Sequence, residues 1–253
     1  MYINPSLDSI RSLSQRLGHP QDRFASVLVA GTNGKGTTAA TLDSILRAAG
    51  QDVGLYTSPH LVRETERVRV RGHEISREDL DDALACVDRV TVHAGVTPSP
   101  FERLTAAAFL IFRDAGVARA ILEVGLGGRW DATAVARADL GLITSIGRDH
   151  VAWLGESLEQ IAAEKAAIAR PGMTVLSAVE RRLHDAVIAP VASGLGAKVL
   201  HLEDSDWWSA GGPPAGHRTL PTAFPGAHGS RNAALAAWAA EQLKVDAQVI
   251  ARG

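Results

Sequence analysis

The sequence predicts an α/β protein with a doubly wound, mostly parallel sheet. Short apolar runs alternate with longer segments of helical spacing along the 253 residues. This alternation is typical of parallel sheets that helices cover on both faces. One apolar run also leads into a glycine-rich loop, GTNGKGT at 31–37, that precedes a helical segment. A strand, a glycine-rich loop and a helix in this order are expected in α/β nucleotide-binding proteins.

The strands are predicted from apolar runs of four to eight residues. They are SVLVA (26–30), DVGLY (52–56), RVRVRG (67–72), ARAILEVG (118–125), LGLITSIG (140–147), MTVLSAV (173–179) and AKVLHL (197–202). Residues 67–72 alternate charged and apolar side chains, which favours a strand with one solvated face. In 118–125 the acidic residue, Glu123, lies toward the C-terminal end. Because ligands of doubly wound sheets bind at the carboxyl ends of strands, these ends are the expected site.

The helices are predicted from apolar spacing and from capping residues. They span 38–49, 76–92, 101–116, about 157–169, about 180–193 and about 231–243. Gly50 fits a C-cap, and Ser76 followed by two acidic residues favours a helix start. The stretch 207–228 is rich in glycine and proline, so we expect a small hairpin excursion near 205–225.

Composition limits the classes of protein. With 46% hydrophobic residues the chain could bury one large α/β core or two small ones, and no low-complexity linker divides it, so we treat 1–253 as one domain. Net charge is -2 and no block of like charges occurs, which argues against a nucleic-acid partner. The single cysteine, Cys86, excludes an intrachain disulfide. We expect a cytoplasmic protein without membrane contact, because no signal peptide and no run of about 18 apolar residues is present.

The loop at 31–37 predicts Mg-ATP binding. Gly31, Gly34 and Gly36 allow backbone N–H groups to approach a phosphate chain. Lys35 can reach the terminal phosphates, and the Thr37 hydroxyl can ligate Mg²⁺. The predicted ATP-binding residues also include Thr32, Asn33 and Thr38.

The loop departs from the strict phosphate-loop pattern G-x-x-x-x-G-K-[ST]. Val29 occupies the first glycine position, and Gly36 separates Lys35 from Thr37. The structural alternative is a glycine-rich turn before a helix.

Four further segments narrow the interpretation: TSPHLVRETERVRV (57–70), ILEVGLGGRWDAT (121–133), ITSIGRDHVAWLG (143–155) and EKAAI (164–168). With AGTNGKGT they resemble the bifunctional dihydrofolate synthase/folylpolyglutamate synthase family, relatives of the Mur ligases. The likeness runs in the family's order from about 17 to 236. It implies ATP-dependent amide formation, in which a carboxylate becomes an acyl phosphate that an amine attacks. The implied substrates are L-glutamate and dihydropteroate or a folate.

The resemblance also implies metal ligands and catalytic residues. Glu123, Ser58 and Thr37 would ligate Mg²⁺, with His150 at a second magnesium, and a monovalent cation site is implied too. The family's equivalent of Lys165 is carbamylated and ligates metal. Catalytic roles follow for Lys35, Lys165 and His150. The structural alternatives are a solvent-facing acid, a surface histidine, and an exposed helix lysine paired with a neighbouring acid.

Substrate contacts are implied at three positions. Asn232, in PGAHGSRNAALA (225–236), would contact the adenine, although an asparagine near a helix start can instead be a cap. Phe101 and Asp131 would contact the pterin. The departures from the family pattern are Gly229 for Gln, Ala134 for Asn, Trp130 for Leu, and Ser99-Pro100 before Phe101. They motivate an alternative ligase that acts on a non-folate carboxylate.

Family members continue into a second, smaller α/β domain that closes over the nucleotide. The sequence stops where the linker to that domain is expected, so we expect the C-terminal ligase domain to be absent and to be required in cis or in trans. A non-catalytic ATP-binding module is the alternative from another functional class. We expect a monomer.

Overall fold

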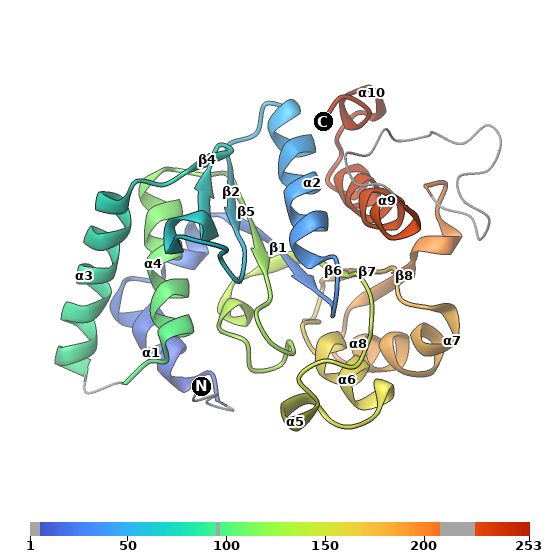
Figure 1. Ribbon diagram of the computed structural model, residues 1–253, viewed down its shortest axis with the longest axis horizontal. Helices are drawn as coiled ribbons and strands as arrows, with labels where there is room; N and C mark the ends of the chain where they lie inside the picture. The colour runs from blue at the N-terminus through green and yellow to red at the C-terminus, as the bar shows by residue number, and fades with distance from the viewer. Residues whose placement is uncertain (1–5, 95–96, 208–225) are drawn as a thin grey trace.

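A computed structural model of the protein describes residues 6–94, 97–207 and 226–253. Eight strands in these residues form one sheet in the order β4-β3-β2-β5-β1-β6-β7-β8. All pairs are parallel except those of β3 with β2 and with β4. The strands are β1 (Ala25–Ala30), β2 (Val53–Tyr56), β3 (Val68–Val70), β4 (His73–Glu74), β5 (Arg119–Glu123), β6 (Ala138–Ile143), β7 (Thr174–Ser177) and β8 (Lys198–His201). The predicted doubly wound, mostly parallel sheet is confirmed (Figure 1).

Helices connect the parallel strands. The α-helices are α1 (Asp8–Arg16), α2 (Lys35–Ala48), α3 (Arg77–Ala94), α4 (Pro100–Asp114), α5 (Val151–Leu154), α6 (Leu158–Ala166), α7 (Arg181–Leu183), α8 (Ala189–Gly194), α9 (Ala227–Gln242) and α10 (Ala247–Ile250). The short helices are η1 (Pro20–Arg23), η2 (Glu64–Arg67), η3 (Ala132–Val135), η4 (His184–Ile188) and η5 (Leu202–Asp204), of which η4 is a π-helix. No helix in the described ranges is both long and apolar enough to span a bilayer.

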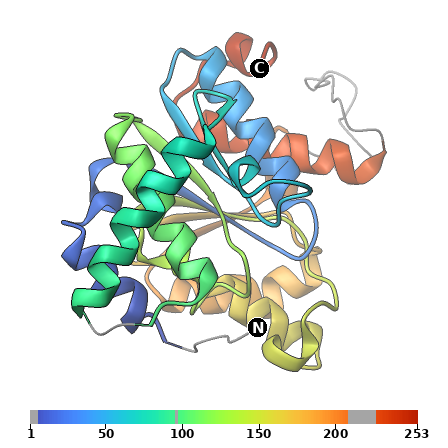
Figure 2. The ribbon, with the colours of Figure 1, turned by 60° about the vertical axis from the view of Figure 1, so that its left-hand side comes forward.

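The central strands are apolar on both faces. In β1, Val27 and Val29 join one buried cluster, whereas Leu28 and Ala30 join another. Helices α2, α9 and α10 cover the first face, and α1, α3, α4, α6 and α8 cover the second. Figure 2 shows α2 (blue) and α9 (red) on one side of the sheet, with the green and yellow helices on the other. Alternating side chains of a strand point to opposite faces, so a strand buried on both faces is a continuous apolar run.

The strand order places the end of β1 between two partners. Val29 pairs with Glu123 of β5, and Ala30 pairs with Ile143 of β6. The chain runs to one side of β1 for β2 and β5 and to the other side for β6, β7 and β8. Ligands of open α/β sheets bind where the strand order reverses in this way.

Several element boundaries differ from the predicted ones. Helix α2 begins at Lys35, three residues earlier than predicted, so the loop lysine belongs to its first turn. The helix predicted at about 180–193 is divided by the π-helical turn η4. Helix α9 begins at Ala227 instead of about 231. Most of the hairpin predicted near 205–225 lies outside the described residues.

Candidate nucleotide and metal site

The glycines of the 31–37 loop are required by its geometry. Gly31 and Gly34 have φ of 144° and 84°, which L-residues rarely adopt. A Cβ at Gly31 would overlap the Thr144 hydroxyl, and a Cβ at Gly34 would lie 2.5 Å from the Asn232 amide nitrogen. The turn therefore lets the backbone pass closely between β6 and α9 before α2 begins. Its exit places the N-terminus of α2, where N–H groups are free of helical partners, at the carboxyl edge of the sheet.

The loop is fixed to the segment that follows β6. The Thr32 amide donates to the Ser145 carbonyl over 2.7 Å. The Thr32 hydroxyl donates to the Gly147 carbonyl at 3.1 Å and accepts from the Gly147 amide at 3.0 Å. These hydrogen bonds hold the loop against the segment that follows β6.

Lys35 and Glu123 face each other across this loop. Lys35 Nζ donates to the Thr32 carbonyl at 3.2 Å and lies 4.0 Å from Glu123 Oε1. Glu123 Oε2 accepts from the Ser58 amide at 3.0 Å. The Glu123 side chain is buried, and burial raises its pKa, although the Ser58 amide and Lys35 oppose that rise. The alternative of a solvent-facing acid is therefore wrong.

Gly36 allows α2 to approach this carboxylate, because a Cβ there would lie 3.4 Å from Glu123 Oε2. The structure thus brings Ser58, Lys35 and Glu123 together.

Lys165 of α6 also reaches the loop. Its Nζ donates to the Gly31 carbonyl at 2.9 Å, and the residue is 4% exposed. Burial, and then the charge of Lys35, lower the pKa of Lys165 to about 8. Its neighbour Glu164 pairs with Arg129 at 3.1 Å instead. The alternative of an exposed helix lysine paired with an adjacent acid is therefore wrong.

Among the described residues, the His150 side chain contacts Asp149 and forms no hydrogen bond or ion pair with Lys35, Glu123 or Lys165. His150 has a left-handed backbone, with φ of 50°, at the start of α5. Its half-exposed ring lies 3.6 Å from the Asp149 carboxylate. In the ranges that the structure describes, no group of three His, Cys, Asp or Glu side chains could hold a metal ion. The predicted metal set therefore depends also on oxygen ligands of other kinds, namely the hydroxyls of Ser58 and Thr37.

The two threonines that follow Gly36 differ in how deeply their side chains are buried. Thr37 is half-buried in the first turn of α2. Thr38 is fully buried, and its hydroxyl has no hydrogen-bond partner among the described residues. The Thr37 side chain is therefore more accessible to a ligand than that of Thr38.

Asn232 faces the phosphate loop from α9. It is the sixth residue of that helix, so the alternative of a helix cap is wrong. Its side-chain amide lies against Gly34. The neighbouring Arg231 donates from Nε to the Ala178 carbonyl at 2.8 Å, and its Nη2 lies 3.4 Å from Glu203. These contacts fix the start of α9 against the carboxyl ends of β7 and β8.

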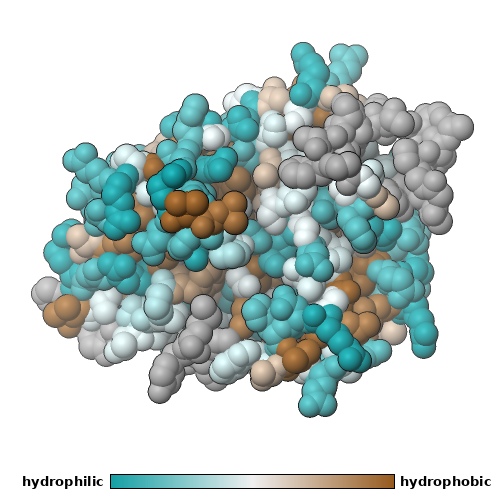
Figure 3. Space-filling model, viewed as in Figure 1, coloured by the Kyte–Doolittle hydropathy of each residue, from teal (hydrophilic) through white to brown (hydrophobic). Residues whose placement is uncertain are grey.

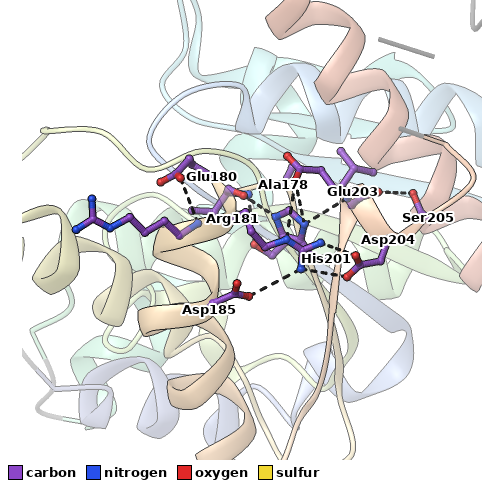
Figure 4. A network of polar contacts seen from close by, with 12 residues as sticks. Ala178, Glu180, Arg181, Asp185, His201, Glu203, Asp204 and Ser205 are labelled. Atoms are coloured by element: carbon purple, nitrogen blue, oxygen red, sulfur yellow. Dashed lines mark hydrogen bonds and ion pairs between the residues drawn. The ribbon is translucent and has the colours of Figure 1, made fainter. Parts of the chain in front are cut away.

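Glu203 belongs to a larger polar network at the ends of β7 and β8 (Figure 4). Arg181 lies 3.8 Å from Glu203 Oε2 and forms a close ion pair with Asp204. The Glu203 amide donates to His201 Nδ1 at 3.3 Å, and His201 Nε2 is 2.7 Å from the Val179 carbonyl. The network ties the strand ends to the helix that bears Asn232.

Asp131 and Phe101 lie beside the glycine-rich loop 125–128. Asp131 is buried, and its Oδ2 accepts from the Gly125 and Leu126 amides, each at 2.9 Å. Its Oδ1 accepts from the amide and hydroxyl of Thr133. The Phe101 ring packs on Gly125 and lies 6.0 Å from the Tyr56 ring. Asp131 therefore organises the loop 125–128 through hydrogen bonds within the chain.

The departures from the family pattern have local explanations in part. Ser99 caps α4 by accepting from the Glu102 amide at 3.2 Å, and Glu102 accepts from the Ser99 amide at 2.7 Å. Pro100 stands at the first helical position, where a missing N–H costs nothing. Trp130 is 48% exposed at the rim of the glycine-rich loop. The structure offers no local reason for this ring.

Apolar side chains are exposed at two places on the same face of the molecule. Leu61 and Val62, in the loop between β2 and β3, are 93% and 77% exposed. Trp153 and Leu158 are exposed on and after α5. Figure 3 shows brown surface over both segments. Two hollows, of about 590 and 520 Å³, lie elsewhere, and no residue of the phosphate loop lines either one.

Sequence reasoning missed three residues that act on the site, two by hydrogen bonds and one by its charge. Thr144 and Ser145 bond to the phosphate loop, and the charge of Asp149 acts on Lys165. Asp149 could have been found as a carboxylate that follows a strand end, beside His150. Nothing local distinguishes Thr144 and Ser145 from ordinary strand residues.

A doubly wound sheet with an anchored glycine-rich loop, a lysine at the start of the next helix and a buried carboxylate on the adjacent strand defines a nucleotide-binding α/β domain. The model of the Mur ligase middle domain matches residues 29–174, which is more than half of the chain. The protein belongs to the Mur ligase family.

Curated relatives narrow the similarity within that family. The chain is 37% identical over 261 residues to a dihydrofolate synthase/folylpolyglutamate synthase of Bacillus subtilis, covering 95% of this chain and 60% of the relative. It is 42% identical over 205 residues to the enzyme of that name from Escherichia coli, covering 81% and 47%. The chain therefore spans about half to three fifths of the length of these relatives.

Solved structures of proteins with the same names show the same similarity. E. coli FolC in complex with DHPP and ADP superposes with a TM-score of 0.86 at 37% identity, covering 99% of this chain and 61% of that one. The bifunctional synthase of Yersinia pestis, complexed with AMPPNP and Mn ion, gives 0.83 at 35% identity, covering 98% and 61%. Similarity at this identity extends across the sheet and both of its faces.

Proposed function

We propose that this chain is the nucleotide-binding part of an ATP-dependent carboxylate–amine ligase of the dihydrofolate synthase/folylpolyglutamate synthase type. One observation is central: Lys35, Glu123 and Lys165 meet around one glycine-rich loop at the carboxyl ends of β1 and β5. The two lysines offer positive charge to phosphate oxygens, and the carboxylate offers a ligand for a cation. Phosphoryl transfer depends mainly on such positioning and charge neutralisation.

The donors at this site fit Mg²⁺. Glu123, Thr37 and Ser58 would supply oxygen ligands, which suit a hard cation. The burial of Glu123 also fits, because burial without a cation disfavours its charged form and raises its pKa. His150 would serve a second magnesium, and we extend the proposal to a monovalent cation. When bound, magnesium would neutralise charge on the transferred phosphoryl group.

Lys165 is proposed to carry a carbamate. The ammonium first loses a proton, the neutral amine then attacks carbon dioxide, a C–N bond forms and a second proton is released, so the side chain changes from cation to anion. Its burial and its pKa of about 8 support this, because a larger share of the amine is neutral near pH 7 than in an ordinary lysine. Mass spectrometry of the native chain in bicarbonate tests it. A mass unchanged by bicarbonate, with nucleotide and magnesium bound, would exclude the carbamate.

The proposed acid substrate is dihydropteroate or a folate, and the proposed amine is that of L-glutamate. Phe101 and the loop organised by Asp131 support a flat aromatic acid beside the phosphate loop. The amide forms when the amine attacks the acyl phosphate and phosphate leaves. Gly31, Thr32, Asn33, Gly34, Gly36 and Thr38 would line the nucleotide with Lys35, and Asn232 would contact its base.

A second candidate acid is favoured by Trp130. Its exposed ring at the rim of the loop would narrow the space beside Asp131, which suits a different carboxylate. We propose further that a C-terminal domain, in cis or in trans, completes the site, that the chain is a monomer in the cytoplasm, and that it needs no nucleic acid.

The test uses the chain together with a C-terminal ligase domain. ADP release is measured with dihydropteroate or tetrahydrofolate plus glutamate, and with a panel of other carboxylic acids. We expect ADP only when both acid and amine are present. ADP formed with another carboxylic acid plus glutamate, but not with dihydropteroate or tetrahydrofolate plus glutamate, would favour the second candidate. Binding of Mg-ATP without turnover on any acid would favour a non-catalytic module.

A further inference from the structure

The carbonyl of Asn33, inside the phosphate loop, is held by two hydroxyls from another strand. Thr144 Oγ1 donates to it at 2.7 Å, and Ser145 Oγ donates to it at 3.0 Å. Both donors follow the end of β6, and Thr144 is buried. A carbonyl has two lone pairs, so it can accept both hydrogen bonds at once.

Ser145 also holds the preceding peptide. Its Oγ accepts from the Asn33 amide at 3.2 Å. The peptide between Thr32 and Asn33 thus has its N–H turned toward Ser145, while its carbonyl points the other way and accepts from Lys35 Nζ at 3.2 Å. The hydroxyl of Ser145 and the ammonium of Lys35 therefore fix the two ends of one peptide group.

The orientation of the next peptide follows from planarity. In a trans peptide, the carbonyl of one residue and the N–H of the next point in opposite directions. With the Asn33 carbonyl turned toward Thr144 and Ser145, the Gly34 N–H points away from β6. A carbonyl turned toward a phosphate would repel it, whereas an N–H attracts it.

We propose that Thr144 and Ser145 are positioning residues that orient the phosphate loop for a nucleoside triphosphate. The inference rests on the proposed function, because that function supplies the phosphates. The same segment continues to His150, five residues after Ser145.

The shape of the loop supports this assignment. A Cβ at Gly31 would overlap the Thr144 hydroxyl, so the turn is built around that group. The Thr144 amide donates to the Ala30 carbonyl at 2.9 Å, which holds the threonine beside the last residue of β1.

The test compares Thr144→Val, Thr144→Ser and Ser145→Ala with the unchanged chain. Thr144→Val keeps the shape and removes the donor, whereas Thr144→Ser keeps the donor. Thr174→Val, at the opposite end of the neighbouring strand β7, is the matched control. Kd for Mg-ATP and for AMP is measured by calorimetry, and amide hydrogen exchange of residues 31–37 is measured without nucleotide.

We expect Thr144→Val to weaken Mg-ATP binding by about tenfold, as loss of one oriented hydrogen bond predicts, and AMP binding much less. Ser145→Ala should do the same, and Thr144→Ser should restore binding. Exchange in the loop should rise in Thr144→Val alone among the threonine variants.

Equal losses for ATP and AMP, or unchanged exchange in the loop, would overturn the positioning role. Failure of the unchanged chain to bind Mg-ATP even with the C-terminal ligase domain present would instead overturn the proposed function, and the role in nucleotide binding with it. The exchange measurement would then still report whether the hydroxyls hold the loop.

Discussion

The side-chain amide of Asn232 rests on the backbone of Gly34, so that a Cβ at Gly34 would lie 2.5 Å from the amide nitrogen. Helix α9 and the phosphate loop are far apart in the sequence, and this contact joins them. Gly34 has a φ of 84°, which adds a conformational reason for glycine to the steric one. The position of Asn232 and the shape of the loop are therefore coupled.

Gly34→Ala is expected to displace Asn232, because an asparagine side chain can rotate away from a new methyl group. We expect Mg-ATP affinity to fall about as far as in Asn232→Ala, by roughly five- to tenfold for one lost hydrogen bond. Since both changes remove the same contact, the double variant should lose little more than either single one. Calorimetric Kd values for the three variants test this coupling.

Gly50→Ala is the matched control for the backbone cost. Gly50 also has a positive φ, of 77°, but a Cβ there would meet nothing within 4 Å. Each glycine variant should lose about 1 kcal/mol in the free energy of unfolding. Only Gly34→Ala should lose nucleotide affinity. Fully additive losses in the double variant would mean that Asn232 acts independently of the loop.

Lys35→Met should abolish most of the affinity for Mg-ATP. The ammonium lies at the start of α2, 4.0 Å from Glu123, and it would bind the terminal phosphates by charge-assisted hydrogen bonds. Losing about 3 kcal/mol of such contacts corresponds to roughly a hundredfold weaker binding. Lys198→Met, on the exposed edge strand β8, is the control. A Lys35→Met chain that binds Mg-ATP as tightly as this control would contradict the phosphate-loop assignment.

The sequence was sufficient for seven of the eight strands in the described residues, but the two-residue edge strand β4 was not predicted. Strands β1 and β5 are apolar runs, so their ends, and with them Gly31 and Glu123, could be located from local pattern. The Lys165 position came from a resemblance alone, because its burial depends on how α6 packs beneath the loop.

Two features of the site that the sequence did not predict correctly, the start of α9 and the hydroxyls of Thr144 and Ser145, have physical explanations. The cap alternative at Asn232 failed because α9 extends four residues upstream, through Ala227 and Gly229, which are not obvious helix-starting residues. The hydroxyls of Thr144 and Ser145 were missed because residues that follow β6 meet those that follow β1 only in the folded sheet.

The buried histidine of the β7–β8 side gives the chain an acid-sensitive stability. The His184 ring packs 4.5 Å from that of His201, and its Nδ1 is buried without a hydrogen-bond partner in the described residues. Burial, and then the charge of His201, lower the pKa of His184 from 6.5 to about 4. Asp185 and Asp204 oppose this shift, whereas Arg181 adds to it.

The sign follows from proton linkage. Between about pH 6.5 and 4 the unfolded chain binds a proton at this residue and the folded chain does not, so stability falls as the pH is lowered. The loss is about 3 kcal/mol and accumulates as the pH falls from about 6.5 to about 4. Urea unfolding across this range should show a weaker pH dependence for His184→Leu than for the exposed control His73→Leu. Identical pH profiles for the two variants would assign the acid sensitivity to other groups.

Asp131 offers a separation of structural from substrate roles. Its two oxygens accept from the Gly125 and Leu126 amides and from Thr133, so Asp131→Asn replaces an acceptor by an NH₂ group that faces donors. We expect the free energy of unfolding to fall by about 2 kcal/mol, because buried donors lose their partner. The exposed Asp114→Asn is the control and should change it little.

The outcome for the acid substrate then distinguishes two roles of Asp131. The Asp131→Asn variant is studied at low temperature, where it is fully folded. If the carboxylate only organises the loop 125–128, the loss of dihydropteroate affinity should be proportional to the increase in amide exchange of that loop. If Asp131 also contacts the pterin, binding should fall while exchange of the loop stays near that of the unchanged chain. If the free energy of unfolding of Asp131→Asn equals that of the Asp114→Asn control, the four hydrogen bonds of Asp131 contribute little to stability. Hydrogen bonds that contribute about 1 kcal/mol each would be visible in urea titrations.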